Sequence, residues 1–95
     1  MSKRINLLTA AANGTISATR QLQTVDVLVS YGGVFSGAVV SLEMLEQGNW
    51  ETVTDGVFTA PGQRLLQLAQ GIEVRAVISS GDGSTEVNLS ISPRY

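Results

Sequence analysis

The segment from Ile72 to Ser92 constrains the fold most, because two alternating runs of apolar and polar residues flank a glycine-rich stretch. Such alternation is typical of a strand with one face in a core and the other in solvent. Gly81-Asp82-Gly83 lies between the runs and suits a tight turn. We therefore predict an antiparallel hairpin that forms the spine of a β-sandwich. Its inward residues are expected to be Ile72, Val74, Ala76 and Ile78 before the turn, and Val87, Leu89 and Ile91 after it.

Turn residues recur at short intervals along the rest of the chain, which is typical of a sandwich or barrel of short strands. The predicted turns are Asn13-Gly14, Gly32-Gly33, Gly48-Asn49, Asp55-Gly56 and Pro61-Gly62. The segments between them predict strands at residues 4–10, 15–23, 25–31, 38–45, 50–53, 57–60 and 64–69.

Two features qualify these strands. Arg20 interrupts the inward face of the strand at 15–23, so we place that strand at a sheet edge or at an interface. Helix competes with strand at 40–47 and 64–69, because the leucines there also fit a period of 3.6. The fold class we predict is all-β, an antiparallel β-sandwich of eight to nine short strands.

The length of 95 residues indicates one domain. We expect residues 1–12 to form an N-terminal arm with a possible first strand, and residues 13–95 to form a single β-sandwich domain. Lys3-Arg4 and the apolar residues after it faintly resemble a signal peptide, but Asn6 and Thr9 break the run, so no cleaved signal is expected. No run approaches the roughly 18 apolar residues of a membrane span, so no membrane partner is expected.

The composition argues against most chemistry. The chain has no histidine and no cysteine, which removes the commonest general base and the thiolate metal ligands. Its six basic residues are scattered and the net charge is −2, so no nucleic-acid partner is expected. Asp55-Gly56 and Asp82-Gly83 resemble pieces of calcium loops but lack the run of ligands. We expect no cofactor, no metal and no enzymatic activity.

Two carboxylates, Glu73 and Glu86, could approach each other across the predicted hairpin, as a glycosidase would require. Both lie on the polar face beside Arg75 and Asn88, so a solvated face explains them better.

The few aromatic residues, 5% of the chain, are the other candidates for function. Trp50 and Phe58 flank Asp55-Gly56, and we predict that they pack together in the core. The alternative is an exposed platform on which a sugar stacks. Phe35 lies in a glycine-rich loop with little local cover, so its burial against a second subunit is a hypothesis.

Four stretches in the second half of the chain carry a resemblance to a known family: Gly48-Asn49-Trp50-Glu51-Thr52-Val53-Thr54-Asp55-Gly56, Thr59-Ala60-Pro61-Gly62, Val74-Arg75-Ala76-Val77 and Thr85-Glu86-Val87-Asn88-Leu89. They resemble small β-sandwich virion proteins of tailed bacteriophages, notably capsid cement or decoration proteins. It implies a jelly-roll-like or immunoglobulin-like sandwich, often trimeric, on the outer capsid surface.

This resemblance implies a structural virion protein that is made in the host cytoplasm, binds the major capsid protein and stabilises contacts between capsomers. A homotrimer is the favoured oligomer. The expected contact residues are Arg4, Arg20, Phe35, Arg94 and Tyr95. Two alternatives remain open: a carbohydrate- or receptor-binding module of a tail or fibre, with Trp50 and Phe58 stacking on the ligand, and a structural subunit of the tail or connector.

Overall fold

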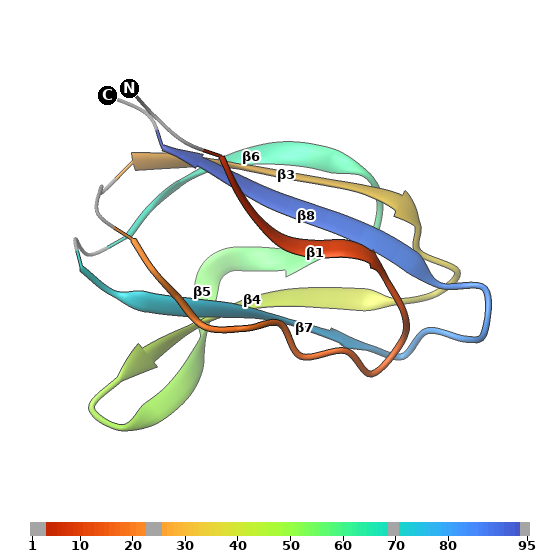
Figure 1. Cartoon of the computed structure of the whole chain (residues 1–95), viewed down its shortest axis with the longest axis horizontal. Helices are drawn as coiled ribbons and strands as arrows, with labels where there is room; N and C mark the ends of the chain where they lie inside the picture. Colours follow the sequence, from red (N-terminus) through yellow and green to blue (C-terminus); the bar gives the residue numbers. More distant parts are fainter. Residues whose placement is uncertain (1–3, 23–25, 69–70, 94–95) are drawn as a thin grey trace.

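The computed structural model describes residues 4–22, 26–68 and 71–93, and every regular element among them is a strand. Eight strands follow one another along the chain (Figure 1). They are β1 (Ile5–Ala11), β2 (Arg20–Gln21), β3 (Asp26–Val34), β4 (Val39–Glu46), β5 (Asn49–Phe58), β6 (Gly62–Gln67), β7 (Glu73–Ser79) and β8 (Glu86–Pro93). The prediction of an all-β chain with eight to nine strands is confirmed.

The strands form two antiparallel sheets of four. Sheet A has the order β1-β8-β3-β6 and sheet B the order β2-β7-β4-β5. Figure 1 shows them as two layers, with β3, β6 and β8 above β4, β5 and β7. The first strand pairs with the last, the second with the seventh, the third with the sixth and the fourth with the fifth. This nested pairing, rolled into two packed sheets, is a jelly roll, one of the two topologies expected.

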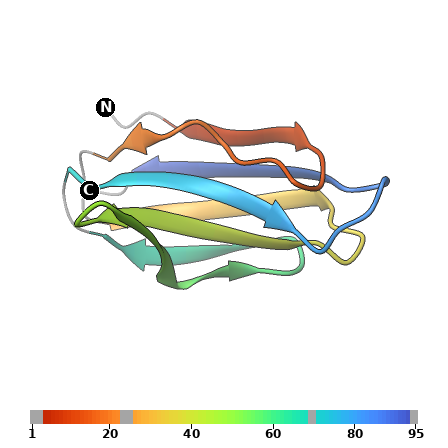
Figure 2. The ribbon, with the colours of Figure 1, turned by 90° about the horizontal axis from the view of Figure 1, so that it is seen from below.

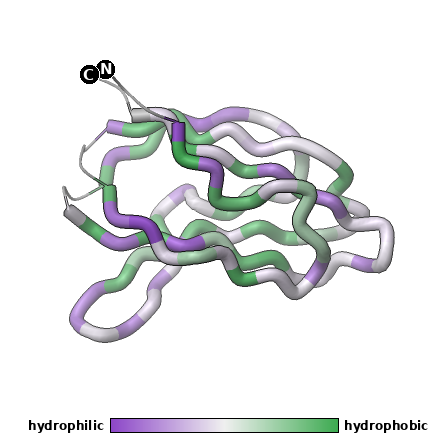
Figure 3. The backbone as a smooth tube through the Cα atoms, in the orientation of Figure 1, coloured by the Kyte–Doolittle hydropathy of each residue, from purple (hydrophilic) through white to green (hydrophobic). Residues whose placement is uncertain are grey.

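Aliphatic side chains from both sheets fill the space between the layers. In the central strands every second residue points inward, as a period of two requires, and Figure 3 shows hydrophobic residues recurring along both layers. The fully buried side chains of these strands are Val27, Val29, Val40, Leu42, Val74, Ala76, Ile78, Val87, Leu89 and Ile91. The predicted inward face of 72–92 is therefore confirmed, with Ile72 partly buried against the core.

The predicted hairpin over 72–92 is wrong, although both of its strands exist. β7 lies in sheet B between β2 and β4, whereas β8 lies in sheet A between β1 and β3. The residues from 80 to 85 cross from one sheet to the other instead of reversing the chain within one sheet. Glu73 and Glu86 thus belong to different sheets and do not face each other across a hairpin.

Two predicted turns are irregularities inside strands. β5 runs through Asp55-Gly56 without a break, so the predicted strands at 50–53 and 57–60 are one. Asp55 has a φ of 62°, and the pairing with β4 shifts between Ser41 and Glu43, which together indicate a β-bulge. Gly32-Gly33 lies within β3. The turn that joins β4 to β5 is Gln47-Gly48, one residue earlier than predicted.

The first two predicted strands also differ in detail. β1 pairs with β8 with two register shifts, and Leu8 is buried while Ile5 and Leu7 are only partly buried. Between residues 15 and 22 only Arg20–Gln21 forms a named strand, and Ile16 is 57% exposed. β2 lies at the edge of sheet B, as Arg20 suggested.

The two competing helices are excluded within the described residues. Residues 39–46 form β4 and residues 62–67 form β6. The end of the second segment, Ala69, lies outside the described residues. Because β1 begins at Ile5, the sandwich itself starts within the predicted N-terminal arm.

Candidate functional site

The outer face of sheet B carries a row of three apolar side chains and one serine. Ile16 pairs with Val77, Val77 with Ser41, and Ser41 with Val57, so the four side chains lie side by side. Ile16 is 57% and Val57 46% exposed. An outer sandwich face is normally polar because it meets water. This row is therefore an exception, which indicates that a partner covers it.

A second apolar pair lies nearer the β4–β5 hairpin, beyond the polar row of Arg75, Glu43 and Thr52. Leu45 pairs with Trp50 across the two strands, and both side chains are half-buried. Figure 2 shows β7, β4 and β5 side by side in this sheet. Val39, at the other end of β4, is half-buried as well. We call the set Ile16, Val39, Ser41, Leu45, Trp50, Val57 and Val77 the apolar face.

The charges on the apolar face neutralise each other. The Arg75 Nε lies 2.8 Å from the Glu43 Oε1, and both side chains are largely covered. The Arg75 guanidinium carbon lies 4.3 Å from the centre of the Trp50 ring, within cation–π range. Arg75 therefore joins an acid and an aromatic ring, and the face presents little unpaired charge.

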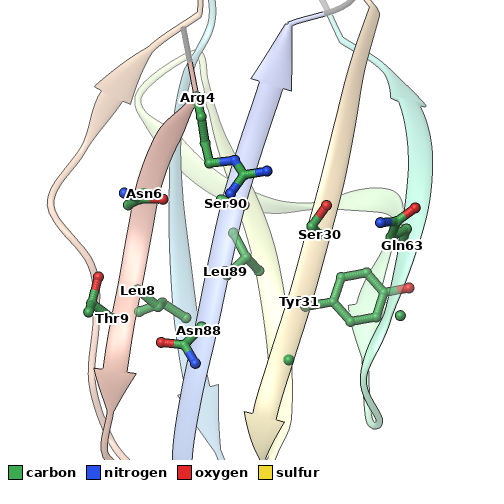
Figure 4. A pocket seen from close by; sticks show the side chains of 12 residues that line it. Arg4, Asn6, Leu8, Thr9, Ser30, Tyr31, Gln63, Asn88, Leu89 and Ser90 are labelled. Carbon is green, nitrogen blue, oxygen red and sulfur yellow. The ribbon is translucent and has the colours of Figure 1, made fainter.

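The outer face of sheet A holds a shallow groove with a volume of 440 Å³ (Figure 4). Asn6, Ser90, Ser30 and Gln63 form one row across β1, β8, β3 and β6, because the register pairs each with the next. Arg4 reaches from the start of β1 toward Ser90 in Figure 4. The groove is thus lined mainly by uncharged polar side chains.

Asn88 is held in place at one end of the groove. Its Oδ1 accepts a hydrogen bond of 2.8 Å from the backbone N–H of Ala10 on β1. Because that bond fixes which way the amide points, the Asn88 NH₂ group faces the β3 side, near Gly33.

The aromatic residues do not form the predicted pair. Phe58 is only 2% exposed and stacks on Tyr31, with ring centroids 3.9 Å apart and an angle of 18° between the planes. Trp50 lies near the opposite end of β5, on the outer face under Arg75. Phe58 is a core residue, as predicted, but the packing of Trp50 on Phe58 is wrong. A joint stacking platform is wrong for the same reason.

The other predicted contact residues are scattered. Phe35 is only 6% exposed and belongs to the core, so the expectation that it lacks cover within its own chain is wrong. Arg4 lies at the groove of sheet A, and Arg20 is exposed on edge strand β2. Arg94 and Tyr95 lie outside the described residues. The structure therefore does not gather these residues into one site.

Asp82 has a structural role in the loop between β7 and β8. Its carboxylate accepts hydrogen bonds from the Ser36 hydroxyl at 2.7 Å and from the Ser84 N–H at 2.8 Å. These bonds lower the pKa of Asp82, the Ser36 bond most, because they favour the charged form. The buried Thr85 hydroxyl donates to the Phe35 carbonyl and accepts from the Asp82 N–H, which ties the two loops together.

The described part of the chain contains no group of three acidic, histidine or cysteine residues that could hold a metal ion. It also contains no helix long and apolar enough to cross a membrane.

The sequence contained a signal for the apolar face that the alternation pattern alone did not reveal. Val77 and Val57 fall at outward positions of their strands, where polar residues are the rule. Such exceptions indicate a covered outer face only after the register shows that they are neighbours.

Comparisons of the chain with protein-family models, with curated proteins and with solved structures find no match. Its function must therefore be inferred from the chemistry of its two outer faces, one apolar and one polar.

Proposed function

We propose that this chain is a structural virion protein of a tailed bacteriophage, a capsid cement or decoration protein that binds the outer capsid surface and stabilises the contacts between capsomers. The apolar face is the observation that carries the proposal. Exposed apolar side chains in register across a sheet cost free energy in water and mark an interaction surface. The major capsid protein is the partner that we assign to it, and the capsid assignment comes from the resemblance in the second half of the chain.

A flat sheet face suits a mechanical role. The central strands β4 and β7 are hydrogen-bonded on both sides, so the face is rigid and pre-formed. Binding such a face across a boundary between capsid subunits adds buried interface without ordering a flexible segment. The cement protein then resists the outward pressure of the packaged genome by linking neighbouring capsomers.

The size of the face favours several copies acting together. Four strands about 4.8 Å apart and seven residues of about 3.3 Å each span only about 450 Å². Stable protein interfaces bury roughly 800 Å² per partner. A homotrimer, which places three faces on the capsid at once, overcomes this shortfall through its high effective concentration.

The oligomer is tested by size-exclusion chromatography with light scattering. A homotrimer has a mass of about 30 kDa, three times the 10.0 kDa of the chain. A monomer at all concentrations would contradict the trimer, while capsid binding would remain to be measured on its own.

Docking is tested by co-sedimentation with mature capsids of the phage that encodes the chain, after removal of the native protein. Val57→Lys places a charge on the apolar face, and we expect at least about a tenfold loss of affinity because an unpaired charge must be desolvated. Leu65→Lys is the matched control. Leu65 is also an exposed apolar residue on an edge strand, but of sheet A.

We expect Leu65→Lys to bind within about twofold of the wild type. If both variants bind as the wild type does, or if the wild type does not bind, the capsid proposal is wrong. Circular dichroism and thermal melting of both variants check that neither loss of binding comes from unfolding.

A further inference from the structure

The shape of the groove on sheet A follows from the sizes of the side chains that line it. Its middle is lined by small residues of the two central strands, Ser30 and Gly32 on β3 and Ser90 on β8. Longer polar side chains stand at its sides, Asn6 on β1 and Gln63 on β6 (Figure 4). Small residues in the centre and long ones at the margins produce a trough along the strands.

Four polar side chains of the trough have no hydrogen-bond partner among the described residues. The side chains of Asn6, Ser30, Gln63 and Ser90 make no hydrogen bond to another described residue. Amides donate and accept at once, and hydroxyls do the same. Asn88 adds an amide that its bond to the Ala10 N–H already orients. The trough therefore offers a set of neutral donors and acceptors at fixed spacing.

Other ligand classes fit the trough poorly. Arg4 is the only cation among its described lining residues, too few for a nucleic-acid backbone. The strands beneath the trough are already paired, β8 with β1 and β3 and β3 with β6, so an extended peptide cannot add to the sheet there. What remains is a flexible, uncharged ligand that is rich in hydroxyl groups.

We propose that the trough on sheet A binds a neutral oligosaccharide. Its 440 Å³ lies within the roughly 300–1,000 Å³ of small-molecule sites. Along β8 the trough extends from Asn88 to Ser90, about 7 Å, and its polar row from Asn6 to Gln63 crosses three strand spacings of about 4.8 Å each. These dimensions suit a short oligosaccharide. Vicinal hydroxyls of a sugar match the paired donor and acceptor of each amide. This function goes beyond capsid docking and uses the opposite face of the sandwich.

Binding is expected to be weak, with a Kd of about 0.1–10 mM. The trough is shallow, and Tyr31 is the only aromatic residue among its described lining residues. Tyr31 already stacks on Phe58, so a sugar gains hydrogen bonds but no stacking platform. Trp50 lies on the other sheet, so ligand binding leaves its fluorescence unchanged.

The experiment is a ¹⁵N NMR titration of the full chain with three neutral sugars, cellohexaose, maltohexaose and N-acetylchitohexaose, each to about 10 mM. We expect at least one of them to shift the amide signals of Asn6, Ser30, Asn88 and Ser90 in a saturable way. If none of the three shifts these signals, or if the shifts fall on the apolar face, the proposal is overturned.

Two serine variants form a matched pair. Ser30 and Ser41 are both half-buried outward residues of the third strand in their sheets, β3 and β4. Ser30→Tyr fills the trough, and we expect at least about a tenfold loss of sugar affinity. Ser41→Tyr places the same side chain on the apolar face and should bind the sugar within about twofold of wild type. Equal sugar affinities in the two variants would contradict the site.

The same pair separates this inference from the capsid proposal. Ser41→Tyr should weaken capsid binding, and Ser30→Tyr should leave it unchanged, because the two faces point in opposite directions. A protein that binds capsids but no sugar overturns only the oligosaccharide site. A protein that binds a sugar through the trough but no capsid overturns only the cement function.

Discussion

Gly32 and Gly33 are neighbours in β3, yet the backbone tolerates a side chain at only one of them. Gly33 has a φ of 99°, and a Cβ there would overlap the carbonyl oxygen of Glu86 on β8. Nothing lies within 4 Å of a Cβ built on Gly32. We expect Gly33→Ala to lower the free energy of unfolding by more than about 2 kcal/mol.

The matched control is Gly32→Ala, which should change that free energy by less than about 0.5 kcal/mol. Urea unfolding followed by Trp50 fluorescence measures both. Equal stabilities of the two variants would mean that β3 and β8 do not approach each other as described.

Asp82 makes stability depend on pH in the acidic range. Its carboxylate accepts two hydrogen bonds in the folded chain, which lowers its pKa below the ordinary value of 3.8. A lowered folded pKa contributes stability that is fully present above the unfolded pKa. That contribution is lost as the pH falls from about 3.8 through the folded pKa.

Thermal melting between pH 7 and pH 2 tests this effect. We expect Asp82→Asn to have a lower Tm than the wild type at pH 7 and to show a smaller decrease below pH 4. Ser36→Ala removes the hydrogen bond that lowers the pKa of Asp82 most. The acid-induced decrease in Tm should therefore begin at a higher pH in this variant than in the wild type. A wild-type Tm that falls no more steeply than that of Asp82→Asn would contradict the role of this loop.

At the scale of elements, the turn of the β4–β5 hairpin contains a residue, Gln47, that is unfavourable for its backbone conformation. Gln47 and Gly48 have φ values of 50° and 83°, and they lie between the paired residues Glu46 and Asn49. A two-residue turn with two positive φ values favours Asn-Gly, because asparagine tolerates this conformation better than glutamine. We expect Gln47→Asn to raise the free energy of unfolding by about 0.5 kcal/mol.

Gly48→Ala is the opposing variant in the same turn. It should lower the free energy of unfolding by about 1 kcal/mol, since alanine is strained at positive φ. Chemical denaturation of the two variants and the wild type gives the order of their free energies of unfolding. If Gly48→Ala is more stable than the wild type, the turn has another geometry.

The strands themselves could be predicted from the sequence, because a period of two is a local property of five to ten residues. The pairing partners of the strands could not be predicted from the sequence. β7 and β8 each satisfy the alternation rule, and a glycine-rich connection suits a hairpin as well as a crossing between sheets. Asp55-Gly56 shows the same ambiguity, because several types of turn and of β-bulge contain a residue with a positive φ, as Asp55 has.

The two candidate surfaces were beyond prediction for a related reason. Asn6 and Ser90 become neighbours only when β1 pairs with β8, and Ile16 reaches Val57 only through β7 and β4. The sequence shows that each residue points outward, but the long-range register decides which outward residues share a row.

At the scale of the whole molecule, nearly all strand pairing joins distant parts of the chain. Ile5 pairs with Ile91 and Arg20 with Val74, whereas only β4 and β5 form a tight hairpin. Long-range pairing slows folding, because the chain loses loop entropy before contacts form. We expect refolding on the millisecond-to-second timescale typical of all-β sandwiches.

Stopped-flow refolding from urea, followed by Trp50 fluorescence, measures this rate. Refolding that is complete within about 100 μs would contradict the nested pairing, since only local structure forms so fast.

The same nesting has a consequence for biosynthesis. Strands leave the ribosome in the order β1 to β8. In sheet A, β8 lies between β1 and β3 and pairs with both, so the strand that joins them is translated last. Sheet A therefore cannot close on a nascent chain, and β1 stays unpaired while the rest of the domain is translated. A translation product that stops before residue 86 lacks the strand that joins β1 to the sandwich. Such a product remains open to proteases, so this topology restricts the folded sandwich to chains that carry all eight strands.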